Sequence, residues 1–294
     1  MPEITIAGRI AWRAMREGAR GRVRAVFERS FYIDLDGQWT CVGPPRLGAG
    51  PLNALWHDSG AVRLPRRDDP VSIAAGTLVV AARPFARLRL GPEPPPAVAR
   101  PWTAATLARG LRQLERVAEP AGPGDGLGCL ISGRIAGSRY AAAAVLPVAH
   151  LNEIVVSRMR ADRPPHFDPA KLVPLLGLGP GLTPSGDDLL GGALVALTAI
   201  GFLDLRDAIW TGVRPYAAAG TNDIARAHLA AAAEGECAAA LDEAVEALLS
   251  GGASLEPALQ AVAAVGHTSG WDALAGVVIV LRAAAAGQAS AEAA

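Results

Sequence analysis

The chain has 294 residues, of which 51% are hydrophobic and 19% are charged, so it can bury one large core or two of ordinary size. Its 28 basic and 28 acidic side chains leave no net charge, which argues against nucleic acid or an anionic membrane as a partner. Three widely spaced cysteines fit neither a disulfide framework nor a metal site, and they favour a reducing cytoplasm.

No segment has the pattern of a signal or membrane anchor. The N-terminus lacks a basic stretch followed by an apolar one, so we do not expect a secretory signal. The longest charge-free apolar run covers residues 189–203. It is shorter than the roughly 20 residues that span a bilayer, and it predicts a buried core helix.

Residues 1–96 are expected to form a small β-rich domain. Segments rich in β-branched and aromatic residues alternate with turns, and they predict strands over 23–27, 31–35, 39–42, 71–82 and 85–90. Asp36-Gly37 is a strong two-residue hairpin signal, and Pro84 is expected to break the pattern near the end. Together these signals predict a small antiparallel barrel or sandwich, within an α+β chain.

Residues 97–294 are expected to form a helical domain. The boundary is the proline-rich segment 91–96, because prolines at this density prevent both a helix and a central strand. Helical spacing predicts helices over 103–117, 138–160 (one helix, or two interrupted near Pro147), 187–202, 204–213, 222–233, 238–249, 255–265 and 271–285. Glycines stand where helix C-caps are expected, at 201, 220, 235, 251 and 266.

One sequence pattern occurs twice in the helical domain. Residues 185–192 read SGDDLLGG and residues 269–276 read SGWDALAG, so both copies give S-G-x-D-x-L-x-G at a distance of 84 positions. Each copy joins a polar, glycine-rich loop to an apolar helix. Two such helix starts suggest two halves of one site.

Helix capping alone can explain the shared residues. Ser185 and Ser269 are good N-cap residues, and Asp188 and Asp272 then fall at the third helical position, where they complete a capping-box variant. This interpretation needs no ligand.

The first copy contains more than a cap requires. Gly179, Gly181 and Gly186 let the backbone approach a ligand and turn several N–H groups toward one point. The helix dipole then favours an anion such as phosphate or carboxylate, and Thr183 and Ser185 add hydroxyl donors. The first loop is therefore the predicted anion-binding loop, and the second is its supporting or acceptor side.

The adjacent carboxylates Asp187 and Asp188 have two interpretations. Together with substrate phosphates they could hold Mg²⁺, or they could only compensate the dipole of the helix that follows. No other metal or cofactor is expected, because the sequence has neither zinc-ligand spacing nor a dinucleotide-binding motif.

Further polar candidates lie between and within the two copies. Asn222 and Arg226 share a helix face, and Arg226 could clamp a carboxylate or phosphate, although a bridge from Asp223 to Arg226 is the simpler interpretation. His228 and His267 could act as acid or base groups. His267 is the better candidate because it lies in the second loop.

The ten residues from Gly179 to Asp188, GPGLTPSGDD, resemble the signature of a bacterial family long labelled as having unknown function. Its best-assigned member is the AllH-type subunit of oxamate carbamoyltransferase in allantoin breakdown. The segments Gly50-Pro51-Leu52-Asn53, Thr221-Asn222 and Gly266-His267-Thr268-Ser269-Gly270 match other recurrent segments of that family in the same order.

The resemblance implies transfer of a carbamoyl group between carbamoyl phosphate and oxamate, within a multi-subunit enzyme or a homo-oligomer. In that case residues 179–186 would bind phosphate, and Asp187 and Asn222 would be further ligand-binding residues. Arg226, Thr268, Ser269 and Gly270 would bind the acceptor. Asp188, His267 and Asp272 would assist proton transfer. Two alternatives remain: a non-catalytic subunit that binds a ligand or holds partners together, and a scaffold whose glycines only permit close helix packing.

Overall fold

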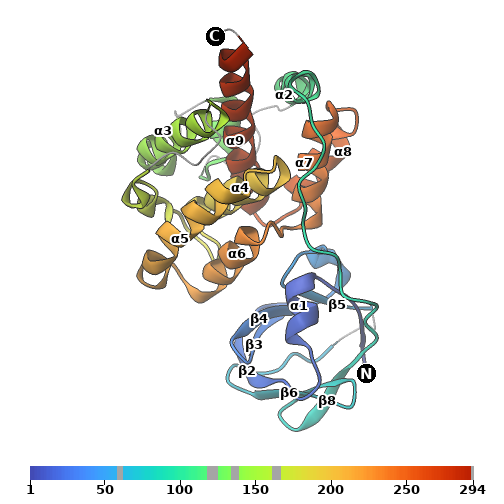
Figure 1. Ribbon diagram of the computed structural model, residues 1–294. Coiled ribbons are helices and arrows are strands. Elements are labelled where there is room, and N and C mark those ends of the chain that lie inside the picture. The colour runs from blue at the N-terminus through green and yellow to red at the C-terminus, as the bar shows by residue number, and fades with distance from the viewer. Residues whose placement is uncertain (58–61, 118–124, 134–138, 161–166, 293–294) are drawn as a thin grey trace. The chain divides into compact units, whose positions relative to one another are not determined.

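The computed structural model describes residues 1–57, 62–117, 125–133, 139–160 and 167–292, with side chains described up to residue 288. The chain forms two compact units, residues 1–96 and residues 97–294 (Figure 1). The first unit is a β-barrel and the second is helical, so the α+β class is confirmed.

The barrel is closed by eight strands in the order β1-β5-β4-β3-β2-β6-β7-β8. Their bounds are β1 Glu3–Ala7, β2 Arg20–Val26, β3 Phe31–Leu35, β4 Gln38–Gly43, β5 Asn53–Trp56, β6 Pro70–Ala74, β7 Thr77–Val80 and β8 Arg83–Leu88, with a short helix α1 at Arg9–Ala14 and a 3-10 turn η1 at Pro45–Leu47.

The barrel is mixed, which corrects the prediction of an antiparallel barrel or sandwich. β4 and β5 run parallel, as do β1 and β8. A parallel pair needs a crossover connection, and residues 44–52, with η1, supply it between β4 and β5. The first and last strands, β1 and β8, pair to close the barrel. Because the two strands are far apart in sequence, no local sequence pattern predicts this pairing.

Turn chemistry sets the strand breaks. Asp36 and Gly37 both have positive φ, 50° and 84°, as a type I′ hairpin requires, so the predicted β3–β4 hairpin is confirmed. The expected strand 71–82 divides at Ala75 and Gly76, which also have positive φ. Pro84 lies within β8, beside an irregularity in its pairing with β7, a position that tolerates proline.

The barrel core forms because alternate residues along each strand face inward. In β3, for example, Phe31, Ile33 and Leu35 are all fully buried. Edge-to-face contacts join Phe85 to Phe31 and to Trp56. The barrel therefore has its own hydrophobic core, as expected of an independent unit.

The helical unit consists of α2 Ala104–Val117, α3 Arg139–Arg160, α4 Ser185–Ala199, α5 Leu203–Gly220, α6 Asp223–Ala233, α7 Ala239–Ser250, α8 Leu255–Ala263 and α9 Ser269–Glu292, with 3-10 turns η2 Gly128–Ser132, η3 Pro169–Lys171 and η4 Val173–Leu175. α9 packs against α4, α3, α2, α7 and α8. It is therefore the central helix of the unit (Figure 1).

Several helix bounds differ from the sequence prediction. α4 begins at Ser185 and α9 at Ser269, each two residues before the predicted start. α3 is one helix despite Pro147. α5 continues to Gly220, so this glycine is helical and the C-cap is Thr221.

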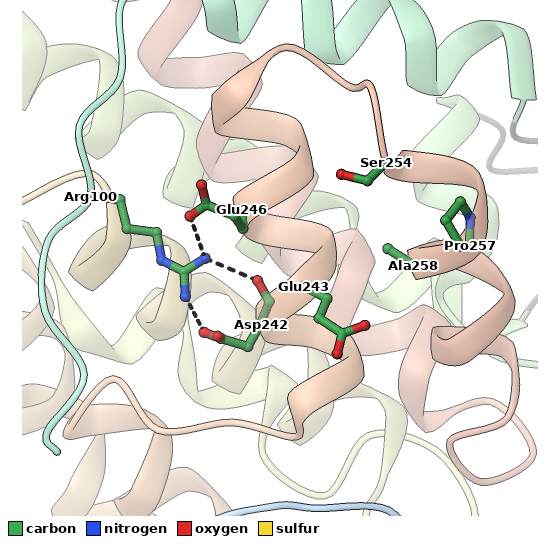
Figure 2. Close-up of a pocket in the computed structure, with 7 residues that line it drawn as sticks. All are labelled: Arg100, Asp242, Glu243, Glu246, Ser254, Pro257 and Ala258. Atoms are coloured by element: carbon green, nitrogen blue, oxygen red, sulfur yellow. Dashed lines mark hydrogen bonds and ion pairs between the residues drawn. The ribbon is translucent and has the colours of Figure 1, made fainter. Parts of the chain in front are cut away.

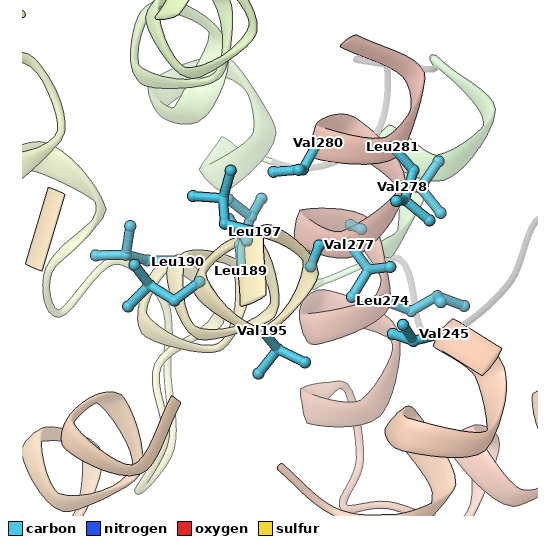
Figure 3. Packing of buried hydrophobic residues seen from close by; sticks show 14 of the residues in the cluster. Leu189, Leu190, Val195, Leu197, Val245, Leu274, Val277, Val278, Val280 and Leu281 are labelled. Carbon is cyan, nitrogen blue, oxygen red and sulfur yellow. The ribbon is translucent and has the colours of Figure 1, made fainter. Parts of the chain in front are cut away.

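α4 and α9 cross at the centre of the helical core, to which Leu189, Leu274 and Val277 all belong (Figure 3). Glycines make the crossing close. A Cβ on Gly192 would lie 1.9 Å from the carbonyl oxygen of Ala273, and a Cβ on Gly276 would lie 1.9 Å from that of Leu189. Because both the glycines and their contacts are 84 positions apart, the two copies pack reciprocally. The repeated pattern thus has a structural function of its own.

Nearly all of α4 is buried, which confirms that its apolar run is a core helix. Two described helices, α3 and α9, are long and apolar enough to cross a membrane by length and composition alone. The apolar stretch of α9 is 67% buried by its neighbours and that of α3 is 39% buried. Since core helices pass the same test, this is weak evidence for a membrane span.

Candidate functional site

The loops that precede α4 and α9 meet in space. Thr183 Oγ1 and Ser269 Oγ are 2.9 Å apart, although the two residues are 86 positions apart in sequence. Two helix N-termini therefore converge at one place, and both copies of the repeated pattern contribute to it.

The predicted capping boxes are absent from the structure. Pro184 is the N-cap of α4 and has no capping side chain, and Ser185 and Ser269 are the first residues of their helices. The amide of Asp188 bonds the carbonyl of Pro184, and the amide of Asp272 bonds that of Thr268. The serine and aspartate side chains are therefore free to interact across the crossing.

The two copies exchange hydroxyl partners. The Asp188 carboxyl interacts with the hydroxyls of Ser269 and Thr183, while the Asp272 carboxyl interacts with those of Ser185 and Thr268. Each aspartate is thus close to the serine of the other copy. The capping-box interpretation places the S-G-x-D contacts within one loop, but in the structure these contacts join two loops.

Asp272 has further donors from a segment that the sequence did not single out. The backbone N–H groups of Leu127 and Gly128 both donate to Asp272 Oδ1. A side chain on Gly126 would come within 2.6 Å of that same oxygen, so only glycine lets this backbone approach. The two glycines of Gly126-Leu127-Gly128 indicate a backbone that can approach another group closely. No nearby sequence feature identifies that group as Asp272.

Burial dominates the electrostatics of both aspartates. It raises the pKa of Asp188 well above its usual range, the neighbouring charges of Asp272 and Asp187 raise it further, and the hydroxyls oppose this shift. Burial likewise raises the pKa of Asp272, against the effect of its hydrogen bonds. A raised pKa favours the protonated form of a carboxyl group and makes its ionised form a stronger base.

Three polar atoms at the crossing lack hydrogen bonds of regular geometry among the described residues: Asp188 Oδ2, Asp272 Oδ2 and Ser185 Oγ. Looser contacts join them to hydroxyl groups: hydrogen bonding from the Ser185 hydroxyl lowers the pKa of Asp272, and that from Ser269 and Thr183 lowers the pKa of Asp188.

Asp187 turns away from its neighbour Asp188. Its Oδ2 accepts hydrogen bonds from the Gly177 amide, at 3.0 Å, and from Thr221 Oγ1, at 2.8 Å. Burial raises its pKa to about 6, against these two bonds. Asp187 thus joins the loop before α4 to the start of α6. Neither Gly177 nor Thr221 was among the predicted site residues.

The adjacent aspartates therefore do not face a common point. Among the residues the structure describes, no group of three or more His, Cys, Asp and Glu side chains could hold a metal ion. Binding of Mg²⁺ stays a sequence-based prediction.

Asn222 connects the first loop to α6. Its Oδ1 accepts hydrogen bonds from the amides of Ile224 and Ala225, both at 3.0 Å, so it is the N-cap of α6. Its Nδ2 donates to the Leu182 carbonyl at 2.8 Å. This side chain holds the loop in place, and both of its polar atoms are used in doing so.

Two of the other predicted polar residues, Arg226 and His267, are paired with residues other than the two aspartates of the crossing. Arg226 bonds Asp223 at 2.6 Å, which is the i, i+3 bridge given as the simpler interpretation. The His267 side chain is 76% exposed, with Nε2 3.7 Å from Asp125 Oδ1. His228 lies on α6, where burial lowers its pKa to about 4.

The glycines of the loops divide into two groups. Gly186 and Gly270 are packing positions, because a Cβ on either would lie 2.1 Å from a carbonyl oxygen, that of Leu175 or that of Val262. Gly179 and Gly181 have φ of 114° and 98° instead, a backbone conformation that glycine alone adopts readily. Gly181 is exposed, so this part of the first loop lies at the surface of the helical unit.

An open hollow of about 550 Å³ lies elsewhere in the helical unit, between Arg100, α7 and α8 (Figure 2). Asp242, Glu243 and Glu246 line it. Arg100 pairs with Asp242 and, at 3.0 Å, with Glu246. None of the predicted site residues belongs to this hollow.

Comparison with known proteins supports the resemblance given by the motif. No solved structure matches the chain. Residues 175–281, which include both loops and the helices α4 to α8, match the model of a protein family. That family is the one described as oxamate carbamoyltransferase subunit AllH, and over these residues it is the family that the GPGLTPSGDD motif indicated.

Proposed function

We propose that this chain is a subunit of a carbamoyl-transferring enzyme and that the junction of the two loops holds its small anionic substrate. The observation that carries the proposal is the meeting of the loops at Thr183 and Ser269, inside the segment that matches the AllH family. A binding site explains why two distant polar loops, each followed by an apolar helix, converge.

The helix starts supply the affinity for an anion. Each N-terminus carries the equivalent of about half a positive charge, and the Gly186 and Gly270 amides of the two helix starts donate to the carbonyls of Leu178 and Val265. α4 and α9 place two such ends together. The positive φ values at Gly177, Gly179 and Gly181 let the preceding backbone curve around a phosphate or carboxylate, as in other anion-binding loops.

The carboxyl groups supply proton transfer. In carbamoyl transfer, the acceptor nitrogen forms a bond to the carbamoyl carbon, the bond from that carbon to the phosphate oxygen breaks, and phosphate leaves with the electron pair. The nitrogen then loses a proton. Asp188 is the proposed acceptor for this proton, because its raised pKa makes it a stronger base than an ordinary aspartate once it is ionised.

The alternative function is a non-catalytic subunit that binds a ligand or assembles partners. One observation favours it: the site residues bond one another, and Arg226, the predicted acceptor clamp, is paired with Asp223. The matching family is described as a subunit, which is compatible with both functions. Both proposals therefore include partner subunits.

An assay of the full chain, alone and with the proteins encoded beside its gene, separates the two functions. Phosphate release from carbamoyl phosphate in the presence of oxamate measures transfer. We expect partners to be required and Asp188→Asn to lower the rate at least about 100-fold, while Asp207→Asn, a change at an exposed residue of α5, leaves it unaltered. Full activity of an Asp188→Asn, Asp272→Asn assembly would establish the non-catalytic function instead.

A further inference from the structure

Helix α3 has an exposed apolar face. By length and composition it could cross a membrane, yet only 39% of its apolar stretch is buried in the structure. Leu146, in the first half of the helix, is 80% exposed, the highest value among the large hydrophobic residues that the structure describes. In Figure 1 α3 lies at the edge of the helical unit, where its inner side packs against α9. Its outer side leaves apolar surface in water, which commonly marks an interaction site.

The exposed residues of this face are spaced as in a helix that pairs with another helix. All five residues of the series Arg139, Ala142, Leu146, Ala149 and Glu153 are exposed, and the steps between them alternate between three and four positions. This spacing keeps them in one stripe along the helix. The three central residues are apolar, and an alanine on each side of the leucine lets the backbone of a second helix approach closely.

The charges at the two ends of the stripe have opposite signs. Arg139 stacks on the ring of Tyr140 and bonds its hydroxyl at 2.6 Å, and both of these groups are neutral. The Glu153 side chain is 72% exposed, with Oε2 3.6 Å from His150 Nδ1. Arg139 stands seven positions before Leu146 and Glu153 seven positions after it. A two-fold axis through Leu146 therefore brings a positive end to a negative one.

We propose that the outer face of α3 binds the same face of a second copy of this chain, with the two helices antiparallel and the two-fold axis at Leu146. In a two-fold contact every pair of residues occurs twice. Arg139 then lies beside the partner's Glu153, and Glu153 beside the partner's Arg139. The two Leu146 side chains meet at the axis, with alanines on both sides. This inference goes beyond the proposed function and does not depend on it.

The stripe suits an antiparallel second copy better than other occupants. Helices that lie on membranes carry bulky apolar and aromatic residues along one face and many basic residues along the other, whereas this stripe has alanines near its centre and charges of both signs. A parallel second copy would bring Arg139 to the partner's Arg139, and like charges disfavour such a contact.

The contact is small. Residues 139–153 cover about four helical turns, or about 22 Å. A contact of this length lies at the low end of specific interfaces, so a dissociation constant on the order of micromolar is expected.

Sedimentation velocity of the full chain, between about 1 and about 200 µM, tests the inference over the range expected of a small interface. We expect a reversible equilibrium between monomer and dimer. Leu146→Glu should raise the dissociation constant at least about tenfold, because it removes the apolar contact and places two like charges at the axis. Val98→Glu changes another exposed hydrophobic residue, outside α3, and should leave the equilibrium unaltered.

Charge reversal tests the antiparallel register. Arg139→Glu and Glu153→Arg should each raise the dissociation constant at least about threefold, because each change opposes like charges twice. The variant that carries both changes restores the opposite charges, so it should return to within about twofold of the wild-type value. These positions are exposed, so the variants should fold, which circular dichroism checks.

Three results would overturn the inference: a wild-type chain that stays monomeric up to about 200 µM, a dimer that Leu146→Glu leaves intact, or a double charge reversal that does not recover. The same variant distinguishes other occupants of the face. If Leu146→Glu abolished binding to vesicles of anionic phospholipid, or to the proteins encoded beside the gene, while self-association persisted, the face would belong to that occupant and not to a second copy.

Discussion

The close crossing of α4 and α9 makes one substitution especially informative. In Gly192→Ala the new Cβ would lie 1.9 Å from the Ala273 carbonyl oxygen and 2.7 Å from its carbon. An ordinary contact begins near 3.4 Å, so the helices would have to separate by about 1.5 Å. Both contact atoms are backbone, and no side chain can rotate to relieve the overlap.

The expected effect is a loss of stability. Overpacking of a buried contact costs about 3 kcal/mol when the backbone must move, and the better helix propensity of alanine returns about 1 kcal/mol. The net loss of about 2 kcal/mol corresponds to a fall in Tm of about 4–8 °C for a unit of this size. Gly276→Ala, the reciprocal change, should behave alike.

The neighbouring glycine supplies the control. A Cβ on Gly191 would meet the Ala232 Cβ at 3.6 Å, which is an ordinary contact. Gly191→Ala should therefore be stabilised by the higher helix propensity of alanine, and its Tm should rise by up to about 4 °C. Circular dichroism at 222 nm follows the helical unit during thermal unfolding. If Gly192→Ala were as stable as Gly191→Ala, the close crossing and the site built on it would be wrong.

Two further predictions concern the residues that hold the first loop. Burial raises the pKa of Asp187 from 3.8 to about 6, so its contribution to stability is fully present below pH 4 and is lost as the pH rises through 6, by up to about 3 kcal/mol. Chemical unfolding between pH 4 and pH 8 should show this decline, and Asp187→Asn should flatten it; an identical pH profile in the variant contradicts the assignment. Asn222→Ala removes the α6 N-cap and the bond to Leu182, so it should cost about 1–2 kcal/mol and speed amide exchange over residues 179–183. Asp223→Ala, which breaks only an exposed pair, should cost under about 0.5 kcal/mol, and equal exchange in both variants would exclude a loop-holding role for Asn222.

Local chemistry determined what the sequence could predict of the fold. The β3–β4 hairpin follows from Asp36-Gly37, which accept positive φ, and the buried helix α4 follows from its apolar run. The parallel pairing of β1 with β8 joins the two ends of the barrel, and no short-range pattern encodes it. Strand β5 and the parallel β4–β5 pair were missed for the same reason.

The candidate site illustrates the same limit. The S-G-x-D pattern fits a capping box within one loop as well as it fits a contact between two loops. Gly192 and Gly276 decide between them, because only their close crossing brings each aspartate to the other copy's serine. The donors from Leu127 and Gly128 were likewise invisible, since they lie about 145 positions from Asp272.

A double-mutant cycle on unfolding free energies tests the exchange of partners between the two copies most directly. Residues in contact couple by about 0.5 kcal/mol or more, whereas independent sites add. We predict such coupling for Asp188→Asn with Ser269→Ala and for Asp272→Asn with Ser185→Ala, and additivity for Asp188→Asn with Ser185→Ala. Coupling confined to Asp188 with Ser185, and to Asp272 with Ser269, would restore the capping boxes and contradict a single site formed by both loops.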